Sequence, residues 1–432
     1  MIAHFKTYFK IEKHIKYSIY LLCFLCSFSS YASFILIPMD DVSQVNHLKA
    51  YGITYWSLQK GNKAKWLLNY QGGSFLLEDD EPTRRECKIR GVSYQVISDT
   101  AAFQILEEIS SPSKNMEAVD LEKAPKIAVY SPKANLPWDD AVTMVLSYAE
   151  IPFDVIYDEE VLEDQLILYE WLHLHHEDFT GQYGRFYGAY RMAPWYIEQK
   201  KEAELLASKL GYSKVSQQKL EVAIKIKNFV AGGGFMFAMC SATDSFDIAL
   251  ASQGVDICES MFDGDISEIN YQEKIDFSKT FAFKDFTLVR NPEEYEFSSI
   301  DMTRKRNITR TADYFSLQEY SAKWDPIPTM LCQNHTSMVK GFMGQTTSFD
   351  RSTIKSDVLV MGENKSNQEA RYIHGVFGKG LFTFYGGHDP EDYQHRVGDA
   401  KTELDLHPTS PGYRLILNNV LFPAAKKKKQ KT

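Results

Sequence analysis

The segment from Asn228 to Ala249, NFVAGGGFMFAMCSATDSFDIA, carries the clearest signals of how this chain folds. Its three glycines end an amphipathic helix, because glycine readily adopts the positive φ found at helix C-termini. The next five residues, FMFAM, form the short apolar run that is typical of a buried parallel strand. Cys240 follows that strand directly. Side-chain oxygens that can cap a following helix come next, on Ser241, Thr243 and Asp244.

A cysteine at a strand-to-helix turn favours nucleophilic chemistry. Its side chain projects from the carboxyl edge of the sheet, where the N–H groups and the dipole of the next helix stabilise a thiolate or an oxyanion. The alternative is a small buried hydrophobic residue, which is the commoner role of a cysteine after an apolar strand. The chemical interpretation therefore requires a partner for Cys240.

A partner is predicted near the other end of the chain. Gly380 to Tyr385, GLFTFY, reads as a second apolar strand and runs directly into GGHDPE. His388 supplies an imidazole at this strand end, and Asp389 and Glu391 supply carboxylates. A histidine and a carboxylate are what a cysteine needs for removal of its proton and for orientation of the base.

On the residues GGGFMFAMC and GKGLFTFYGGHDPE, the chain resembles the class I glutamine amidotransferase-like superfamily. The similarity is to the branch that contains the biotin-protein-ligase N-terminal-like and trehalose-utilisation-like domains. The resemblance implies an α/β fold with a flavodoxin-like doubly wound parallel sheet. It also implies that Cys240 is the nucleophile, His388 the general base and Glu391 the residue that orients the base. Because Asp389 stands between the histidine and Pro-Glu, either Asp389 or Glu391 could be the third member.

The whole chain also resembles exported bacterial proteins labelled asparagine synthetase B, in the segments LHLHHEDFTGQYG and CSATDSFD and in the lysine tail. A synthetase of that name needs an N-terminal cysteine nucleophile and a Ser-Gly-Gly-x-Asp-Ser loop for pyrophosphate, and the sequence has neither. We therefore expect no ATP-dependent step.

The first residues predict export. Four lysines precede an apolar run from Tyr17 to Phe28, and Ser30-Tyr31-Ala32 has the small-x-small pattern of a signal-peptidase site. The apolar run is shorter than the roughly 20 residues that span a bilayer, so we expect no transmembrane segment in the mature chain. The expected location is the periplasm or cell envelope. The mature chain is acidic, since the whole chain carries a net charge of −9 and the leader is basic.

With 432 residues, the chain is long enough for more than one domain. Strands alternating with helices suggest βαβ units in the N-terminal part. The expected segments are a signal peptide (1–32), a small N-terminal α/β domain (33–122), the first part of an amidotransferase-like domain (123–262), a mostly β inserted region (263–351), the second part of that domain (352–423) and a basic tail (424–432).

A histidine cluster is the second place where chemistry is expected. Tyr169 to His175 reads as a parallel strand, in which His173 and His175 face the same side. Two imidazoles on one face could share a zinc ion, with Asp178 or Glu177 completing the site. The alternative is that these histidines only satisfy hydrogen bonds in a crowded strand end. No other cofactor is expected.

The following loop and aromatic segment predict a substrate surface. His176 and the Ser241 N–H lie at strand ends, and Gly181 allows close approach of backbone to a ligand. Tyr183 and Arg185 belong to an aromatic run, 179–196, which could cover the crevice and stack on a glycan or peptide. Packing of the run against its own domain is the alternative.

Three function classes remain open. The first is a thiol-dependent hydrolase of amide or ester bonds in the cell envelope, acting on a small molecule, glycan or peptide. The second is a non-catalytic binding module on the same fold, and the third is a metal-assisted hydrolase that uses His173, His175 and His388. Nucleic acid is disfavoured because the chain is acidic. The lysine tail could contact acidic lipid or envelope polysaccharide.

Overall fold

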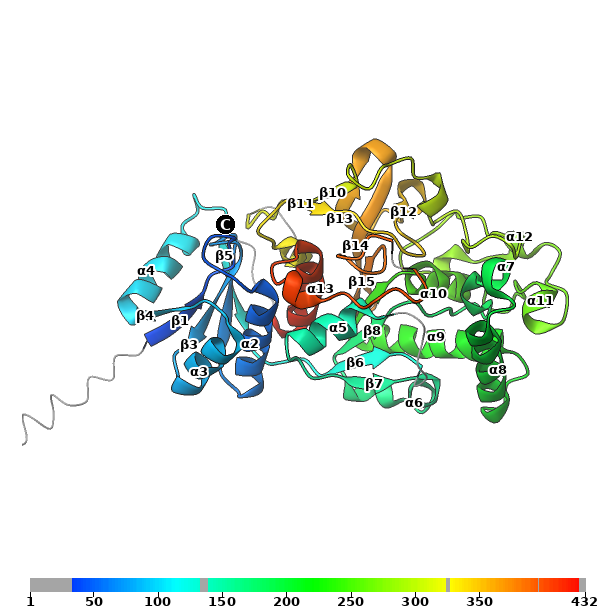
Figure 1. Ribbon diagram of the computed structural model, residues 1–432, viewed down its shortest axis with the longest axis horizontal. Coiled ribbons are helices and arrows are strands. Elements are labelled where there is room, and N and C mark those ends of the chain that lie inside the picture. Colours follow the sequence, from blue (N-terminus) through cyan, green and yellow to red (C-terminus); the bar gives the residue numbers. More distant parts are fainter. Residues whose placement is uncertain (1–32, 133–138, 324–326, 395, 427–432) are drawn as a thin grey trace, which may run out of the picture.

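The computed structural model describes residues 33–132, 139–323, 327–394 and 396–426 (Figure 1). The predicted signal peptide lies outside these residues, and so does the tail beyond residue 426. Within the described ranges, no helix combines the length and apolar character needed to cross a membrane. The described chain folds into two sheets with helices packed on them, so the protein is a mixed α/β protein.

The N-terminal unit is one sheet with three helices. Its elements are β1 (Ser33–Ile37), α2 (His47–Gln59), β2 (Ala64–Leu68), β3 (Ser74–Glu78), α3 (Glu81–Arg90), β4 (Gln95–Ser98), α4 (Asp99–Ser110) and β5 (Glu117–Leu121). The strand order is β4-β1-β3-β2-β5, and every pair is antiparallel. The prediction of βαβ units here is therefore wrong, because alternation of strands and helices along the chain does not decide which strands pair.

The second unit contains a run of five parallel strands. These are β6 (Ile127–Tyr130), β7 (Asp154–Ile156), β8 (Trp171–Leu174), β9 (Phe235–Met239) and β15 (Gly380–Tyr385). They lie side by side in the order β7-β6-β8-β9-β15. Since β9 and β15 are hydrogen-bonded neighbours, two segments far apart in the sequence end on the same rim, as predicted.

Antiparallel strands extend this sheet beyond β15. They are β14 (Glu369–Phe377), β13 (Leu359–Asn364), β10 (Tyr314–Leu317) and β11 (Met338–Lys340), and β12 (Phe349–Asp350) pairs with β14 off the main path. All of these pairs are antiparallel. The sheet is therefore parallel only on the side that carries Cys240.

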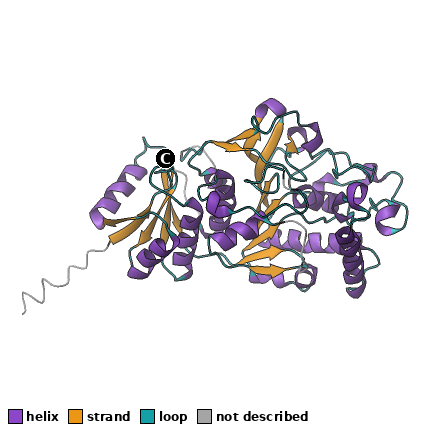
Figure 2. Ribbon diagram, in the orientation of Figure 1, coloured by secondary structure: helices purple, strands orange, loops and turns teal. Residues whose placement is uncertain are grey.

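Helices cover both faces of the parallel strands (Figures 1 and 2). On one face, α5 (Ala141–Tyr148) and α13 (Pro411–Leu421) share a core with Phe237 of β9. On the other face, α9 (Val215–Gly232) and α10 (Ala242–Ala251) share a core with Met236. Alternate residues of β9 thus enter two different cores, which explains why the strand is apolar throughout. The remaining helices are α6 (Asp158–Leu162), α7 (Tyr187–Tyr190), α8 (Pro194–Lys209), α11 (Ser260–Asp263) and α12 (Tyr271–Lys274).

The region 263–351 is mostly loops and short 3-10 turns, with β10, β11 and β12 as its only strands among the described residues. The expectation of a mostly β insertion is not met, because Phe281, Phe283 and Phe286 are buried in loops and not in strands. Asp247 of α10 holds one such loop by accepting the N–H groups of Phe281, Ala282 and Phe283, at 2.7, 2.7 and 3.0 Å. The region is thereby fastened to the helix that follows Cys240.

The two units meet where α2 packs on α13. Arg414 of α13 is fully buried there, and its guanidinium donates to the Tyr51 hydroxyl at 3.1 Å and the Met39 carbonyl at 2.9 Å. It also donates to the Gly72 carbonyl. One side chain of the second unit thus satisfies acceptors from three segments of the N-terminal unit.

Candidate active site

Cys240 occupies a sharp turn between β9 and α10. Its φ is 55°, the left-handed region that non-glycine residues enter only when the surrounding structure imposes it. The Cys240 N–H donates to the Gly387 carbonyl at 3.2 Å, and the Ala242 N–H donates to the His175 carbonyl at 2.9 Å. The turn is therefore held between the ends of β15 and β8, and the predicted strand-to-helix position of Cys240 is confirmed.

Cys240 is 3% exposed. Burial raises its pKa to about 12, although the backbone N–H groups of Ser241 and Gln345 face the sulfur and act in the opposite direction. Carboxyls of Asp244 and Asp301 raise the thiol pKa further. A thiol with this pKa carries almost no thiolate at neutral pH, so nucleophilic attack requires a base in contact with it during reaction.

His388 lies at the end of the neighbouring strand, in the loop after β15, and is 5% exposed. Its Nε2 lies 2.8 Å from the backbone carbonyl oxygen of Asp139. A carbonyl only accepts, so Nε2 carries the proton and Nδ1 has the lone pair of a base. Gly344 packs against the same loop, where a Cβ added to Gly344 would lie 2.7 Å from the backbone nitrogen of His388.

The two carboxylates predicted to orient His388 are engaged elsewhere. Asp389 is fully buried and accepts hydrogen bonds from the Thr402 and Tyr413 hydroxyls, both at 2.7 Å. Glu391 pairs with His407, at 3.1 Å between Oε2 and Nδ1. The partner that the structure gives His388 for orientation is the Asp139 carbonyl.

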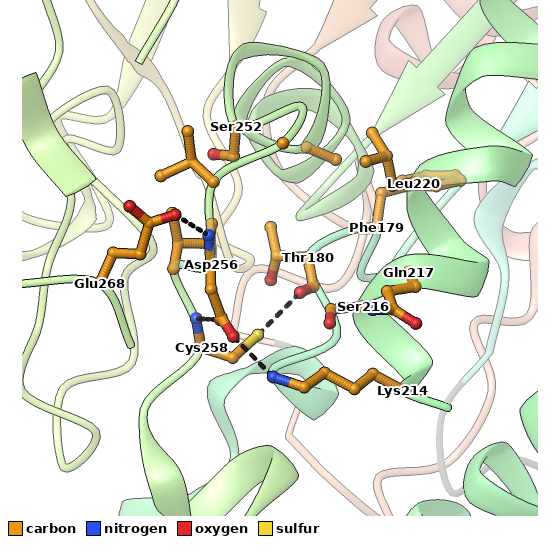
Figure 3. Close-up of a pocket in the computed structure, with 14 residues that line it drawn as sticks. Phe179, Thr180, Lys214, Ser216, Gln217, Leu220, Ser252, Asp256, Cys258 and Glu268 are labelled. Atoms are coloured by element: carbon orange, nitrogen blue, oxygen red, sulfur yellow. Dashed lines mark hydrogen bonds and ion pairs between the residues drawn. The ribbon is translucent and has the colours of Figure 1, made fainter. Parts of the chain in front are cut away.

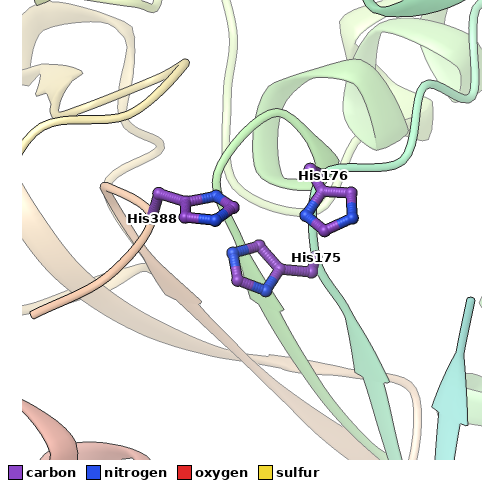
Figure 4. Close-up of side chains that lie close together, drawn as sticks. All are labelled: His175, His176 and His388. Atoms are coloured by element: carbon purple, nitrogen blue, oxygen red, sulfur yellow. The ribbon is translucent and has the colours of Figure 1, made fainter. Parts of the chain in front are cut away.

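Three histidine rings converge beside the cysteine turn (Figure 4). One ring nitrogen from each of His175, His176 and His388 lies within 4.8 Å of the others. The ring centroids of His175 and His388 are 4.4 Å apart. The expectation that the strand-end histidines and His388 lie close together is confirmed, since parallel strands bring their carboxyl ends to one edge.

The predicted metal set of His173, His175 and Asp178 is not assembled. His173 contacts the Asp140 carboxylate through Nε2 and the Phe237 carbonyl through Nδ1, both at 3.2 Å. Asp178 accepts from the Thr180 N–H at 2.7 Å and the Gly184 N–H at 3.0 Å, so it shapes its own loop. His173 and His175 do face the same side, as predicted, since both contact one oxygen of Asp140. The set fails because Asp178 is turned into its own loop.

Sequence reasoning missed Asp140. One oxygen of its carboxylate caps α5, accepting the N–H groups of Val142 and Thr143 at 2.8 and 2.9 Å. The other oxygen lies 3.2 Å from His173 Nε2 and 3.3 Å from His175 Nδ1. The two histidines overcome the effect of burial and hold the pKa of Asp140 well below its usual range. The available signal was an acidic helix cap in the loop after β6, at the same carboxyl edge as the histidines.

A cavity of 670 Å³ opens beside these groups and is lined by Cys240, His388, His176, Tyr190 and Tyr295, among others. Phe186 and Tyr190 of the aromatic run also line it, and both pack against Trp195 in edge-to-face or tilted contacts. The run therefore packs on itself and also reaches the cavity. Its size suits a small molecule or the end of a larger one.

The other predicted substrate residues divide between this cavity and the loop that supports it. Arg185 lines the cavity, but its guanidinium donates to the carbonyls of Val289, Asn291 and Glu294 at distances of 2.5–3.1 Å. Gly181 packs on the backbone of Ser216, and Tyr183 faces a separate cavity of 270 Å³. Ser241 is fully buried and offers its N–H beside the thiol.

A further cavity of 330 Å³ lies near Cys258 (Figure 3). The Cys258 thiol donates to the Thr180 carbonyl at 3.2 Å, and Lys214 binds Asp256 at 2.6 Å. Cys240 is not part of a disulfide in the described chain, so its sulfur is a thiol.

Comparisons with known proteins leave the family open. No family model matches the chain, and no curated protein matches it. Among solved structures, it is similar to the cytoplasmic proteins STM3548 of Salmonella typhimurium and STM1381 of Salmonella typhimurium LT2, at 11% and 13% identity. Each similarity covers 70% of this chain and 100% of the other, with a TM-score of 0.34. A similarity to the GH42 beta-galactosidase Gan42B has a TM-score of 0.26 at 13% identity and covers 62% of this chain and 28% of that one.

Proposed function

We propose that this protein is a thiol-dependent acyl-transfer enzyme, a hydrolase of amide or ester bonds, with Cys240 as nucleophile and His388 as base. The observation that carries the proposal is the positive φ of Cys240 at a strand-to-helix turn, next to the strand end that bears His388. A strained turn of this kind presents a nucleophile at the edge of an α/β sheet. Both side chains line one cavity large enough for a substrate.

The proposal includes a flavodoxin-like, doubly wound core of the amidotransferase-like kind. Numbered along the chain, the parallel strands have the order 2-1-3-4-5, which is the flavodoxin order. Helices on both faces support the same interpretation. In such sheets ligands bind outside the carboxyl ends of the strands, and that is the edge where Cys240 and His388 lie.

The reaction would begin with transfer of the thiol proton from Cys240 to Nδ1 of His388. The sulfur then attacks the carbonyl carbon of the substrate, and the oxyanion is held by the N–H groups of Ser241 and Gln345. Collapse of the adduct breaks the bond to the leaving amine or alcohol, which takes the proton from His388. Water, deprotonated by the same ring, then attacks the acyl carbon of the thioester. The C–S bond breaks, the carboxylic acid leaves, and the sulfur takes the proton back from His388.

The substrate class follows from the cavity lining. Tyr190 and Tyr295 provide aromatic surface, and Arg396 and Arg304, which pairs with Glu296 at 2.8 Å, provide polar groups. We propose a small molecule, glycan or peptide that bears the acyl bond. Export to the periplasm or cell envelope, proposed from the N-terminal residues, would place this substrate outside the cytoplasm.

The test is acyl-enzyme formation with p-nitrophenyl acetate, followed by intact-protein mass spectrometry. The mature protein should gain one acetyl group on Cys240, and Cys240→Ala should gain none. Cys258→Ala is the matched control, because Cys258 is also a buried thiol whose pKa burial raises, and it should react like the wild type. His388→Gln should slow acylation by about a hundredfold or more, as expected for loss of a general base. Equal acylation of wild type and Cys240→Ala would overturn the proposal and favour a binding module.

A further inference from the structure

We propose that His175, His176 and His388 form a binding site for one divalent transition-metal ion of the Zn²⁺ type. The three rings point toward one another, two from the end of β8 and one from the loop after β15 (Figure 4). One nitrogen of each ring lies within 4.8 Å of the other two. Three imidazoles are a recognised ligand set for zinc, and they leave one coordination position for a small molecule.

The second nitrogen of two of these rings faces an oxygen of the kind that supports a metal-binding histidine. His175 Nδ1 lies 3.3 Å from the Asp140 carboxylate, a contact that favours Nε2 as the ligand atom. His388 Nε2 lies 2.8 Å from the Asp139 carbonyl, so its lone pair is on Nδ1. A carboxylate or carbonyl on the far side of a ligating histidine fixes the tautomer and increases its basicity.

Asp140 is itself held firmly. It caps α5 with one oxygen and contacts His173 with the other, and His173 is in turn fixed by the Phe237 carbonyl. His175 therefore keeps its orientation through a chain of buried contacts. Such support is what gives a metal site its affinity, because the ligands are ordered before the ion arrives.

Three other candidate groups lie among the described residues, and one of them, Asp140, His173 and His175, shares His175 with the proposed site. The remaining two are less suited to a cation. In the group of Asp256, Cys258 and Asp263, the Lys214 ammonium already binds both carboxylates, at 2.6 and 3.0 Å. The group of Asp41, His47 and His335 lies beside the Arg414 guanidinium, which lowers the pKa of both histidines together with burial. At the first group the Lys214 ammonium takes the place of a metal ion, and at the second the Arg414 guanidinium would repel one.

Metal binding would control the proposed thiol chemistry, and this consequence rests on the proposed function. Nδ1 of His388 cannot accept the Cys240 proton while it ligates an ion. The metal-loaded protein should therefore form acyl-enzyme more slowly than the metal-free protein. The cavity that borders His176, His388 and Cys240 gives the ion and a small ligand access to the site.

The experiment uses the mature protein, stripped with EDTA, dialysed and titrated with Co²⁺ in place of Zn²⁺. We expect one Co²⁺ per chain with the visible absorption of a tetrahedral ion, and displacement by one equivalent of Zn²⁺. His176→Gln should weaken Co²⁺ binding at least tenfold, and this half-buried side chain can be replaced without disturbing the core. Asp140→Asn should weaken it about 10- to 100-fold, the usual cost of losing such a support. His335→Gln is the matched control and should bind as the wild type does.

Two results would overturn the metal site: no Co²⁺ binding by the wild type, or equal binding by wild type and His176→Gln. Cys240→Ala separates this proposal from the proposed function, because it should retain full Co²⁺ binding while losing acylation. If acylation occurs without metal binding, only the site proposed here fails. If Co²⁺ binds to His175, His176 and His388 but Cys240 never acylates, only the thiol enzyme fails.

Discussion

The two sheets of this molecule collect side chains in different ways. In the N-terminal sheet every strand pair is antiparallel, so successive strand ends lie at opposite edges and no single edge gathers their loops. In the second sheet five neighbouring strands are parallel, and their carboxyl ends bring Asp140, His175, Cys240 and His388 to one edge. The difference teaches that strand direction, more than residue content, decides where this chain can assemble a site.

On this view the N-terminal unit contributes stability and the parallel edge contributes chemistry. The largest test of that division is Arg414→Met at the junction. The substitution leaves the Met39 and Gly72 carbonyls and the Tyr51 hydroxyl without their buried donor. We expect the free energy of unfolding to fall by about 3 kcal/mol, measured by urea denaturation, because each unsatisfied buried acceptor costs about 1–3 kcal/mol.

The control for this prediction is Arg84→Met, whose partly exposed ion pairs with Asp79 and Glu81 should contribute little to stability. In urea-free buffer, Arg414→Met should acylate Cys240 at the wild-type rate. A fully folded Arg414→Met protein that reacts tenfold more slowly would show that the N-terminal unit takes part in the site.

The parallel edge should also give the protein an unusual pH dependence. Burial raises the pKa of Asp301 to about 6, although the Thr303 hydroxyl and the N–H groups of Thr303 and Thr346 partly offset this effect. Between pH 4 and 6 the unfolded chain ionises this carboxyl while the folded chain keeps it neutral. The folded state therefore binds more protons in that window, and its stability falls as pH rises.

The titration of Asp301 should lower the free energy of unfolding by about 3 kcal/mol as pH rises to about 6, since each pKa unit corresponds to about 1.4 kcal/mol. Above that pH the effect should level off. Urea denaturation of wild type and Asp301→Asn at pH 4, 5, 6 and 7 measures it. The wild type should lose stability relative to Asp301→Asn across pH 4 to 6 and run parallel to it from pH 6 to 7. A constant difference at all four pH values would show that Asp301 titrates normally.

The sequence was sufficient to predict which two strand ends meet at the candidate site, but not the side chains that surround them. The apolar run before Cys240 and the one before His388 were strong enough to identify two buried strands, and parallel pairing then placed their ends together. The third strand was predicted as Tyr169 to His175 and runs from Trp171 to Leu174. His173 and His175 share a side as predicted, but the prediction did not bring His176 beside His175 and His388.

Longer-range contacts were beyond what the sequence pattern could predict. Whether Glu391 meets His388 or His407 depends on the loop between β15 and α13, whose conformation has no periodic signal. Asp140 looks like an ordinary helix cap, and its contact with His173 arises only when β6 and β8 pair. The helix α3 was missed although Asp80 caps its start and Gly91 ends it with φ of 69°, because its apolar residues are few.

The smallest predicted effect concerns the close packing that positions His388. Gly344 has no room for a side chain, because an added Cβ would lie 2.7 Å from the backbone nitrogen of His388 and 3.0 Å from the carbonyl carbon of Gly387. Gly344→Ala should therefore displace the loop that carries His388 while leaving Cys240 in place. We expect acylation to slow about tenfold, since misplacement of a catalytic group by a fraction of an ångström to 1 Å costs up to about a hundredfold.

Gly232→Ala is the matched control, because an added Cβ there meets no atom within 4 Å. Gly232 lies at the end of α9 and not in the loop that carries His388. It should acylate at the wild-type rate.

The pair of variants also separates the two proposals, because a displaced His388 should weaken Co²⁺ binding in Gly344→Ala as well. If Gly344→Ala slowed acylation but bound Co²⁺ normally, His388 would act on the thiol without serving as a ligand. If both properties were unchanged, the position of His388 would not limit either one, and the role given to the parallel edge would rest on Cys240 alone.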